Sequence, residues 1–177
     1  MSLCKKIIHS LGLLIAINST VVVAQSCQTA SIPATTPSSR FTVLSNGTVT
    51  DSKTGLIWKQ CSEGLSGGSC TVGKAASYTW KAALQRAQTV NANGGFAGYA
   101  DWRVPNVKEL RSITERQCYS PAINATIFPN TVSNYYWSSS PVANDSDGAW
   151  IVDFDAGAAY WYNKGFFNYV RLVRSGQ

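Results

Sequence analysis

The chain has 177 residues, of which 15 are Lys or Arg and 9 are Asp or Glu, so its formal net charge is +6. This length suits one domain with its own hydrophobic core, and the basic residues are spread along the chain rather than gathered in a tract that would bind nucleic acid. The only histidine is His9, near the N-terminus. The rest of the chain therefore excludes Ser-His and Cys-His nucleophilic sites and histidine-ligated metals.

The N-terminus has the pattern of a secretory signal peptide. Lys5 and Lys6 precede an apolar run that ends at Ala24, which predicts a signal over residues 1–24 and lowers the formal charge of the exported chain from +6 to +4. No later stretch approaches the roughly 20 apolar residues of a membrane-spanning helix. We expect a secreted, periplasmic or cell-surface protein without a transmembrane anchor, and lipidation at Cys27 is the alternative.

Four cysteines follow the predicted signal, an even number in a chain bound for an oxidising compartment: Cys27, Cys61, Cys70 and Cys118. They predict two disulfides, for which three pairings exist. A Gly/Ser-rich loop separates Cys61 from Cys70 and closes easily, so we favour Cys61 with Cys70 and Cys27 with Cys118. A zinc site is disfavoured because no C-x-x-C spacing is present.

The chain after the signal begins with a lead-in and continues as one domain. Residues 25–39 are rich in Ser, Thr and Pro, which predicts an extended segment, and residues 40–177 form the domain. Two β-branched runs within residues 41–51 flank Asn46-Gly47, a strong signal for a β-hairpin. A third strand is expected in GLIWKQ, residues 55–60.

Two helices and a cluster of strands are predicted next. Apolar residues at steps of three and four predict a helix from Ser77 to Asn93, and Gly94 ends it. A second helix begins at Asn106, where Glu109 completes a capping box. Short strands follow in YYWSSS, AWIVDFD, AAYWYNK and NYVRLVR. The fold class is therefore α+β, with two helices packed on short antiparallel strands.

Several motifs occur in an order that resembles a known family. They are DSKTGLIWKQC, GYADWRVPNVKEL, PAINATIFP, YYWSSSP, AWIVDF and YVRLVRSG. Together they resemble the Lcl C-terminal domain family over residues 41–176. The resemblance implies a C-type-lectin-like fold, related to that of formylglycine-generating enzymes, and a role in adhesion or glycosaminoglycan binding. The collagen-like stalk of the adhesin that names the family is absent, so trimerisation through a stalk does not transfer.

The motif charges are expected to be structural. Arg103, Glu109, Arg171 and Arg174 are interpreted as a charge network that clamps the loops of the domain through buried pairs. The tryptophans of the motifs are expected to share the core, because aromatic side chains bury a large area: Trp58, Trp102, Trp137 and Trp150.

Residues 135–169 hold eleven of the twenty Phe, Trp and Tyr residues. Consecutive residues of a strand point to opposite faces, so at least one face of AAYWYNK shows aromatic rings to solvent or to a partner. Tyr160, Tyr162, Asn163 and Lys164 are therefore the predicted ligand-binding residues, with rings for stacking on sugars and polar groups for their hydroxyls. Burial against neighbouring loops is the alternative.

Two pairs of carboxylates are candidates for metal binding or catalysis. Asp145 and Asp147 in a turn hint at calcium, but the segment lacks a complete set of oxygen ligands. Asp153 and Asp155 on one strand face could act on a glycosidic bond, but nothing in the sequence completes such a site. We expect no cofactor and no enzymatic activity.

The leading hypothesis is a binding module whose ligand surface lies between residues 138 and 168. Its partner is expected to be a glycan or a glycosaminoglycan-like surface polymer, and the positive charge would make binding sensitive to salt. An accessory domain that binds an envelope protein, within an envelope or pilus assembly, is the alternative. A carboxylate-dependent enzyme acting on polysaccharide is the third hypothesis.

Overall fold

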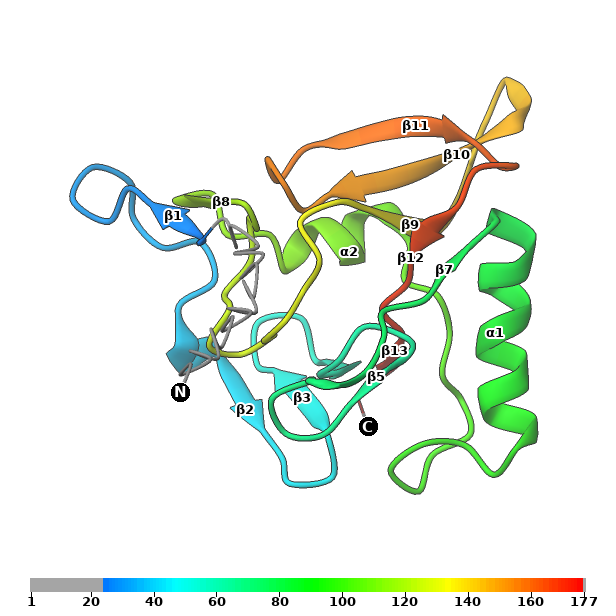
Figure 1. Cartoon of the computed structure of the whole chain (residues 1–177), viewed down its shortest axis with the longest axis horizontal. Coiled ribbons are helices and arrows are strands. Elements are labelled where there is room, and N and C mark those ends of the chain that lie inside the picture. The colour runs from blue at the N-terminus through cyan, green and yellow to red at the C-terminus, as the bar shows by residue number, and fades with distance from the viewer. Residues whose placement is uncertain (1–23, 177) are drawn as a thin grey trace, which may run out of the picture.

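The computed structural model describes residues 24–176 and has two main sheets and two α-helices (Figure 1). The four-stranded sheet is antiparallel, and the five-stranded sheet is antiparallel except where β12 pairs with β9 in parallel. The predicted signal peptide lies outside the described residues, apart from Ala24. Neither helix in the described part has the length and hydrophobicity needed to cross a membrane. The predicted α+β class and both predicted disulfides, Cys27–Cys118 and Cys61–Cys70, are confirmed.

The lead-in is attached to the domain near its start. Strand β1 (Ser26–Cys27) pairs with β8 (Cys118–Tyr119), and a disulfide joins the paired residues Cys27 and Cys118. A lipid thioether would need the same sulfur atom, so this disulfide is incompatible with lipidation at Cys27. A short 3-10 helix, η1 (Ser38–Arg40), leads into the first sheet.

The four-stranded sheet confirms the predicted hairpin and third strand. Phe41 pairs with Asp51 across the turn that contains Asn46-Gly47, and Gly47 has a φ of 81°, which only glycine adopts easily. The strands lie in the order β13-β4-β3-β2. Their bounds are β2 (Phe41–Val43), β3 (Thr48–Asp51), β4 (Leu56–Lys59) and β13 (Val173–Ser175). A small hairpin follows, formed by β5 (Leu65–Ser66) and β6 (Val72–Gly73), and the Cys61–Cys70 disulfide closes part of its loop.

The first helix begins later than predicted. Helix α1 (Trp80–Ala92) starts after Thr79, whose hydroxyl accepts a hydrogen bond from the backbone of Ala82. Residues 77 and 78 instead form strand β7 (Ser77–Tyr78), because β12 offers them a hydrogen-bonding partner. The predicted glycine stop is present, with Gly94 at a φ of 89°.

The second helix begins where the sequence predicts. In α2 (Val107–Ser112) the Asn106 side chain accepts from the backbone of Glu109, and the Glu109 carboxylate accepts from the backbone of Asn106. This capping box satisfies N–H groups that have no partner within the helix. Leu110 and Ile113 are fully buried, so α2 turns its other side to solvent.

The five-stranded sheet has the order β11-β10-β9-β12-β7. The predicted strand NYVRLVR is wrong as one element: Val170–Leu172 lie between two strands that belong to different sheets, because these buried residues carry the chain from one sheet to the other. The remaining bounds are β9 (Tyr135–Val142), β10 (Asp145–Asp153), β11 (Ala159–Asn163) and β12 (Asn168–Tyr169).

The two faces of this sheet cover two separate core clusters. Ala149 and Ile151 pack with α1 residues, whereas Val152 packs with Leu110 and Ile113 of the α2 region. The expected shared tryptophan core is thus divided: Trp58 lies in the α2-side cluster, and Trp102 and Trp137 lie in the α1-side cluster. Trp150 is only partly buried and lies at the surface on the α2 side.

Candidate functional site

A groove on the α2 face of the five-stranded sheet has the best chemistry for holding a charged ligand. It has a volume of about 470 Å³. We call it the α2 groove, and its lining residues are Val107, Lys108, Arg111, Ser112, Arg116, Trp150 and Ala159. A second hollow of about 310 Å³ shares Arg111, Ser112 and Arg116 with it and continues to Lys53. The two hollows therefore form one continuous surface.

Local structure places the cations of the groove. Lys108 and Arg111 are three residues apart on α2, so their side chains are neighbours on one side of the helix. The start of α2 is fixed to β9, because Ser140 Oγ accepts from Val107 N at 3.1 Å. Arg116 follows α2, and its backbone N–H donates to Thr35 Oγ1 at 3.0 Å. These anchors leave all three side chains exposed.

No ion pair among the described residues neutralises the positive charge of the groove. None of the five ion pairs among residues 24–176 includes Lys53, Lys108, Arg111 or Arg116. Residues 107–116 contain two carboxylates, and both already have partners away from the groove. Glu109 binds Arg103 through two contacts of 2.7 Å, and Glu115 is buried against the lead-in. Three exposed cations therefore face solvent around one partly buried indole, and Lys53 adds a fourth in the adjoining hollow.

The geometry of Glu115 keeps it ionised without placing its charge in the groove. Burial alone would raise the pKa of Glu115, but hydrogen bonds from Thr35, Thr36 and Gln117 outweigh burial and lower it. Both threonine hydroxyls and both threonine N–H groups bind this carboxylate. Glu115 therefore holds the lead-in against the domain beside Arg116.

The predicted ligand-binding residues lie elsewhere, at β11 and the turn after it. Tyr162 packs between Tyr135 and Phe166, with ring centroids 5.3 and 4.9 Å away. Asn163 Oδ1 accepts from Gly165 N, and Lys164 Nζ donates to Ser146 O at 2.7 Å. Lys164 also lies 4.6 Å from the centre of the Trp80 ring. Tyr162, Asn163 and Lys164 are thus neighbours in the structure, and each already contacts other residues of the chain.

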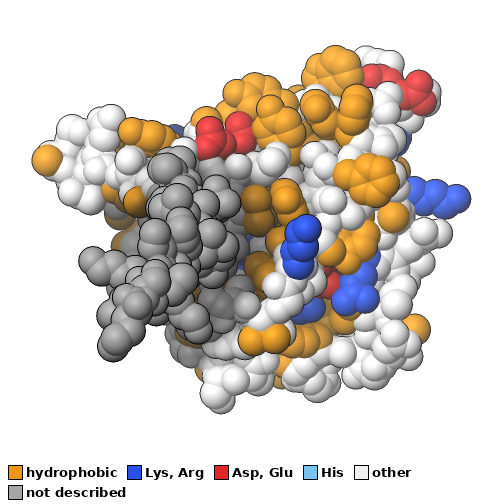
Figure 2. All heavy atoms as spheres, viewed as in Figure 1, with side chains coloured by type: hydrophobic (Ala, Val, Ile, Leu, Met, Phe, Trp, Pro, Cys, Tyr) orange, Lys and Arg blue, Asp and Glu red, His pale blue; other side chains and the backbone are white. Residues whose placement is uncertain are grey.

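Tyr160 is exposed but faces away from the α2 groove. Tyr160 and Tyr162 pair with Ile151 and Ala149, whose side chains pack on the α1 side. Trp161 pairs with Trp150, so these two indoles share the α2 face. Figure 2 shows hydrophobic side chains gathered over β10 and β11 at the upper rim of the molecule.

The predicted charge network consists of separate contacts. Arg103 pairs with Glu109, and Arg174 pairs with Asp101 at 2.7 Å. Arg171 contacts no carboxylate among the described residues. It donates to the carbonyls of Lys59 and Gln60 and to the hydroxyls of Ser62 and Thr131. Arg171 and Arg174 therefore join segments that are distant in the sequence, whereas Arg103 binds a residue six positions away.

The two aspartate pairs have structural contacts. Asp145 and Asp147 lie in β10 rather than in the preceding turn, and Asp145 Oδ1 accepts from Asp147 N at 2.9 Å. Residues 24–176 contain no group of three or more His, Cys, Asp or Glu side chains that could hold a metal ion.

Asp153 and Asp155 do not share a strand face. Asp153 ends β10, and Asp155 lies in the turn that follows. Burial raises the pKa of Asp153, whose Oδ1 accepts from Asp155 N, while hydroxyls of Ser133 and Ser120 lower the pKa of Asp155. The two carboxylates therefore stabilise the turn through hydrogen bonds.

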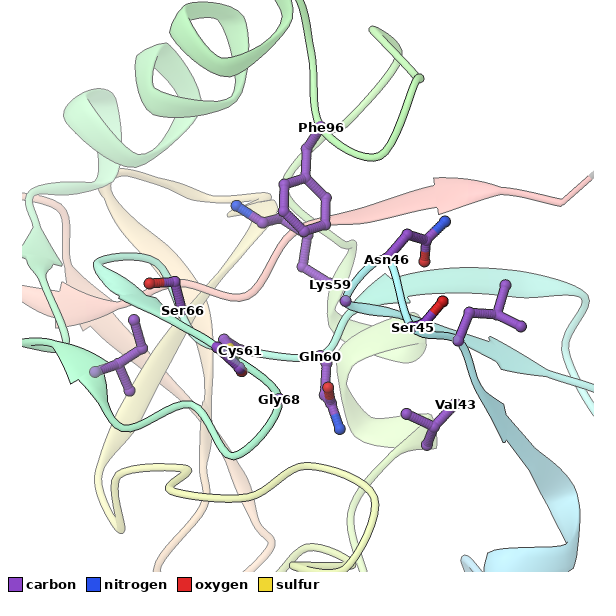
Figure 3. Close-up of a pocket in the computed structure, with 13 residues that line it drawn as sticks. Val43, Ser45, Asn46, Lys59, Gln60, Cys61, Ser66, Gly68 and Phe96 are labelled. Atoms are coloured by element: carbon purple, nitrogen blue, oxygen red, sulfur yellow. Dashed lines mark hydrogen bonds between the residues drawn. The ribbon is translucent and has the colours of Figure 1, made fainter.

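A third hollow lies between the hairpin turn and the Cys61–Cys70 loop and has a volume of about 450 Å³ (Figure 3). Phe96 closes one side, and Lys59 lies 4.4 Å from the centre of its ring. Lys59 already pairs with Glu63, which also pairs with Arg86, and the Gln60 amide donates to Ile127 O. This hollow therefore suits a neutral or apolar occupant rather than an anion.

Sequence reasoning missed the α2 groove. The spacing of Lys108 and Arg111 on a capped helix was a usable signal for two adjacent cations. Arg116 and Trp150 join them only through the tertiary fold, since Trp150 is far away in the sequence.

The fold and the groove define a small, disulfide-bonded α+β domain with a cationic surface that includes an exposed part of one indole. The chain belongs to the Lcl C-terminal domain family, whose sequence model matches residues 47–174. This match confirms the resemblance found in the sequence. A search of curated proteins gives no match.

Proposed function

We propose that this chain is an exported binding domain that holds an anionic glycan, or a comparable acidic surface polymer, in the α2 groove. The observation that carries the proposal is the set of exposed cations around Trp150 that have no ion-pair partner among the described residues. Arginine side chains bind planar anionic groups through two parallel hydrogen bonds. An indole offers an apolar face on which a sugar ring stacks.

Two further features support the proposal. Two disulfides are typical of proteins that work in an oxidising compartment, in agreement with the predicted signal peptide. We therefore place the protein in the periplasm, at the cell surface or outside the cell. The proposed binding requires no calcium and no catalytic step, and it assigns Asp145, Asp147, Asp153 and Asp155 to turns and strands.

A protein-binding role in an envelope assembly is the second candidate. The observation that favours it is the group of exposed aromatic residues around β11 and the following turn. Exposed Tyr, Trp and Phe side chains are enriched where proteins contact one another. This surface lies outside the α2 groove, so the two candidates make different predictions for the same variants.

The test is an array of neutral, carboxylated and sulfated polysaccharides probed with the oxidised chain. It is run at low and high salt, with calcium and with a chelator. We expect binding to sulfated and carboxylated polymers that falls at high salt and is unaffected by the chelator, because exposed charges are screened by ions. Binding to neutral polymers at either salt concentration, or a blank array with folded protein, would contradict the proposal.

A further inference from the structure

Strand β11 is a free edge of the five-stranded sheet. The other edge is the two-residue strand β7, whereas β11 runs over Ala159–Asn163 and lies at the outer rim of the molecule (Figure 1). An edge strand presents N–H and C=O groups that another strand can pair with. The longest exposed edge of this sheet is thus available for pairing.

The hydrogen bonds on either side of β11 show which of its backbone groups face outward. Lys164 N donates to Asp147 O, and Asp153 N donates to Ala158 O, at the two ends of an unbroken register with β10. Hydrogen-bonded and non-hydrogen-bonded pairs alternate along an antiparallel ladder. Tyr160 and Tyr162 therefore bond to β10, while the N–H and C=O groups of Ala159 and Trp161 and the N–H of Asn163 point to the free edge. The Asn163 C=O already accepts from Phe166 N at 3.1 Å.

This edge lacks the features that keep edge strands apart. Residues 156–163 contain no charged residue and no proline. Lysine, proline and inward-pointing charges are the usual protection of an edge. Tyr160 is 49% exposed and Trp161 is 59% exposed, on opposite faces of the strand. The edge combines free backbone groups with uncovered aromatic rings on both faces.

We propose that β11 pairs with β11 of a second copy of this chain, antiparallel and around a two-fold axis at Trp161. Facing residues in an antiparallel ladder share a face, so a two-fold axis perpendicular to the sheet must pass through a residue pair. With the axis at Trp161, the outward N–H and C=O groups of Trp161 form hydrogen bonds with those of Trp161 in the second copy. Ala159 then faces Asn163, and Tyr160 faces Tyr162.

The pairing is self-complementary in shape and charge. On the α2 face the two Trp161 rings lie side by side, and on the α1 face each Tyr160 meets a Tyr162. Aromatic cross-strand pairs stabilise sheets, and an uncharged segment meets an identical one without repulsion. Half of an aromatic side chain offers about 100 Å², so Tyr160 and Trp161 of two copies cover about 400 Å². This area is below the roughly 1,000 Å² of stable interfaces, so the dimer is weak and concentration-dependent.

Pairing at β11 has a consequence for the α2 groove. A two-fold axis perpendicular to the sheet keeps the faces of both copies on the same side. Trp161 shares its face with Trp150 and Ala159 of the groove, so the dimer presents two grooves on one surface. Two linked sites hold a polymer more tightly than one. This consequence rests on the proposed function, whereas the dimer itself does not.

The dimer is tested by sedimentation velocity of the chain, expressed with its own N-terminal sequence and recovered oxidised, from about 10 µM to about 1 mM, without any polymer. We expect the sedimentation coefficient to rise with concentration. Trp161→Lys, which places a charge at the edge, should remove the rise. Phe167→Lys is the matched control, because Phe167 is 69% exposed but lies after the strand, and its variant should associate like the wild type.

Residue-resolved hydrogen exchange of the wild-type chain supplies a test that does not depend on any variant folding. The amides of Trp161 and Asn163 should exchange quickly in dilute solution and become protected as concentration rises. The amides of Tyr160 and Tyr162 should stay protected throughout, because they bond to β10. A monomer at every concentration, association that survives Trp161→Lys, or protection elsewhere than β11 would overturn the proposal. A blank polysaccharide array would leave these results unchanged, so the two proposals fail separately.

Discussion

Glu115 shows how one buried carboxylate connects the lead-in to the binding surface. Its oxygens accept from Thr35 and Thr36 at 2.8 to 3.0 Å, and its neighbour Arg116 lines the α2 groove. Because these hydrogen bonds favour the ionised form, the pKa of Glu115 is lower in the folded chain. A carboxyl group of this kind stabilises the fold above its unfolded pKa, and the contribution is lost as pH falls through the folded pKa.

We predict that Glu115→Gln lowers the free energy of unfolding at pH 7 by about 1.5–3 kcal/mol, the usual range for hydrogen bonds to a charged group. The difference between wild type and variant should shrink as pH falls below the ordinary glutamate pKa of about 4.3, because the unfolded chain then takes up a proton more readily than the folded carboxyl group, whose pKa is lowered. Urea unfolding at pH 7 and pH 3 measures both values. An equal difference at the two pH values would show that the charge of Glu115 is not what holds the lead-in.

Arg171 is a fully buried cation that contacts carbonyl and hydroxyl oxygens instead of a carboxylate. Burial lowers its pKa to about 10. Its guanidinium joins the end of β4, at Lys59 and Gln60, to Thr131, and lies 4.9 Å from the centre of the Phe128 ring. Its position between β12 and β13 makes it the connection between the two sheets.

We predict that Arg171→Met destabilises the chain, although methionine fills much of the same space. The carbonyls of Lys59 and Gln60 lose their donor, and each unsatisfied buried acceptor costs about 1–3 kcal/mol. Urea unfolding measures the change, and Arg174→Met is the comparison, since its partner Asp101 is exposed and can bind water. An Arg171→Met variant as stable as the wild type would mean that the cost of burying the charge cancels its hydrogen bonds.

Helix α2 is the element on which the proposed function depends most. It is short, so its ends and its contacts with the sheet determine its stability more than its length does. The capping box closes its start, Leu110 buries its inner side, and Lys108 and Arg111 lie on its outer side. The same helix therefore contributes to the core and carries two of the groove's three cations.

We predict that Asn106→Ala costs about 1 kcal/mol of stability, the usual loss of an N-cap, whereas Asn106→Thr, which keeps a capping oxygen, costs less. Thermal and urea unfolding of the two variants provide the measurement. Equal stability of the alanine variant and the wild type would show that packing of Leu110 alone holds the helix.

Elements that depend on neighbouring residues were predictable from the sequence. The Asn46-Gly47 hairpin and the Asn106 capping box are examples, because their hydrogen bonds lie within a few residues. The predicted start of α1 was wrong because β12 pairs with Ser77 and Tyr78, a contact from far along the chain. Thr79 was a local signal for the true start, since its side chain caps the helix.

The site was harder to predict than the fold, for a physical reason. Tyr162 and Lys164 were predicted to bind ligand because of their residue types. In the structure Tyr162 already packs on Phe166, and Lys164 already lies over the Trp80 ring. Residue type does not show which groups already have partners. The α2 groove needs Trp150, which reaches α2 only because β10 crosses beneath the helix.

At the scale of the whole molecule, the sheet divides the core and separates two surfaces. One face packs on α1, and the other packs on α2 and ends in the cationic groove. The free edge at β11 lies between these faces. Polymer binding and self-association are thus assigned to different residues of one sheet, and variants can separate them.

The most direct test of the central claim is the affinity of the oxidised chain for one sulfated polysaccharide, compared between two charge-matched variants. Arg111→Gln with Arg116→Gln removes two cations from the α2 groove, and Lys74→Gln with Lys81→Gln removes two exposed cations outside it. We predict a loss of about tenfold or more for the groove variant, equal to about 1.4 kcal/mol, and little change for the control. Equal losses in the two variants, or no loss in either, would contradict the assignment of binding to the α2 groove.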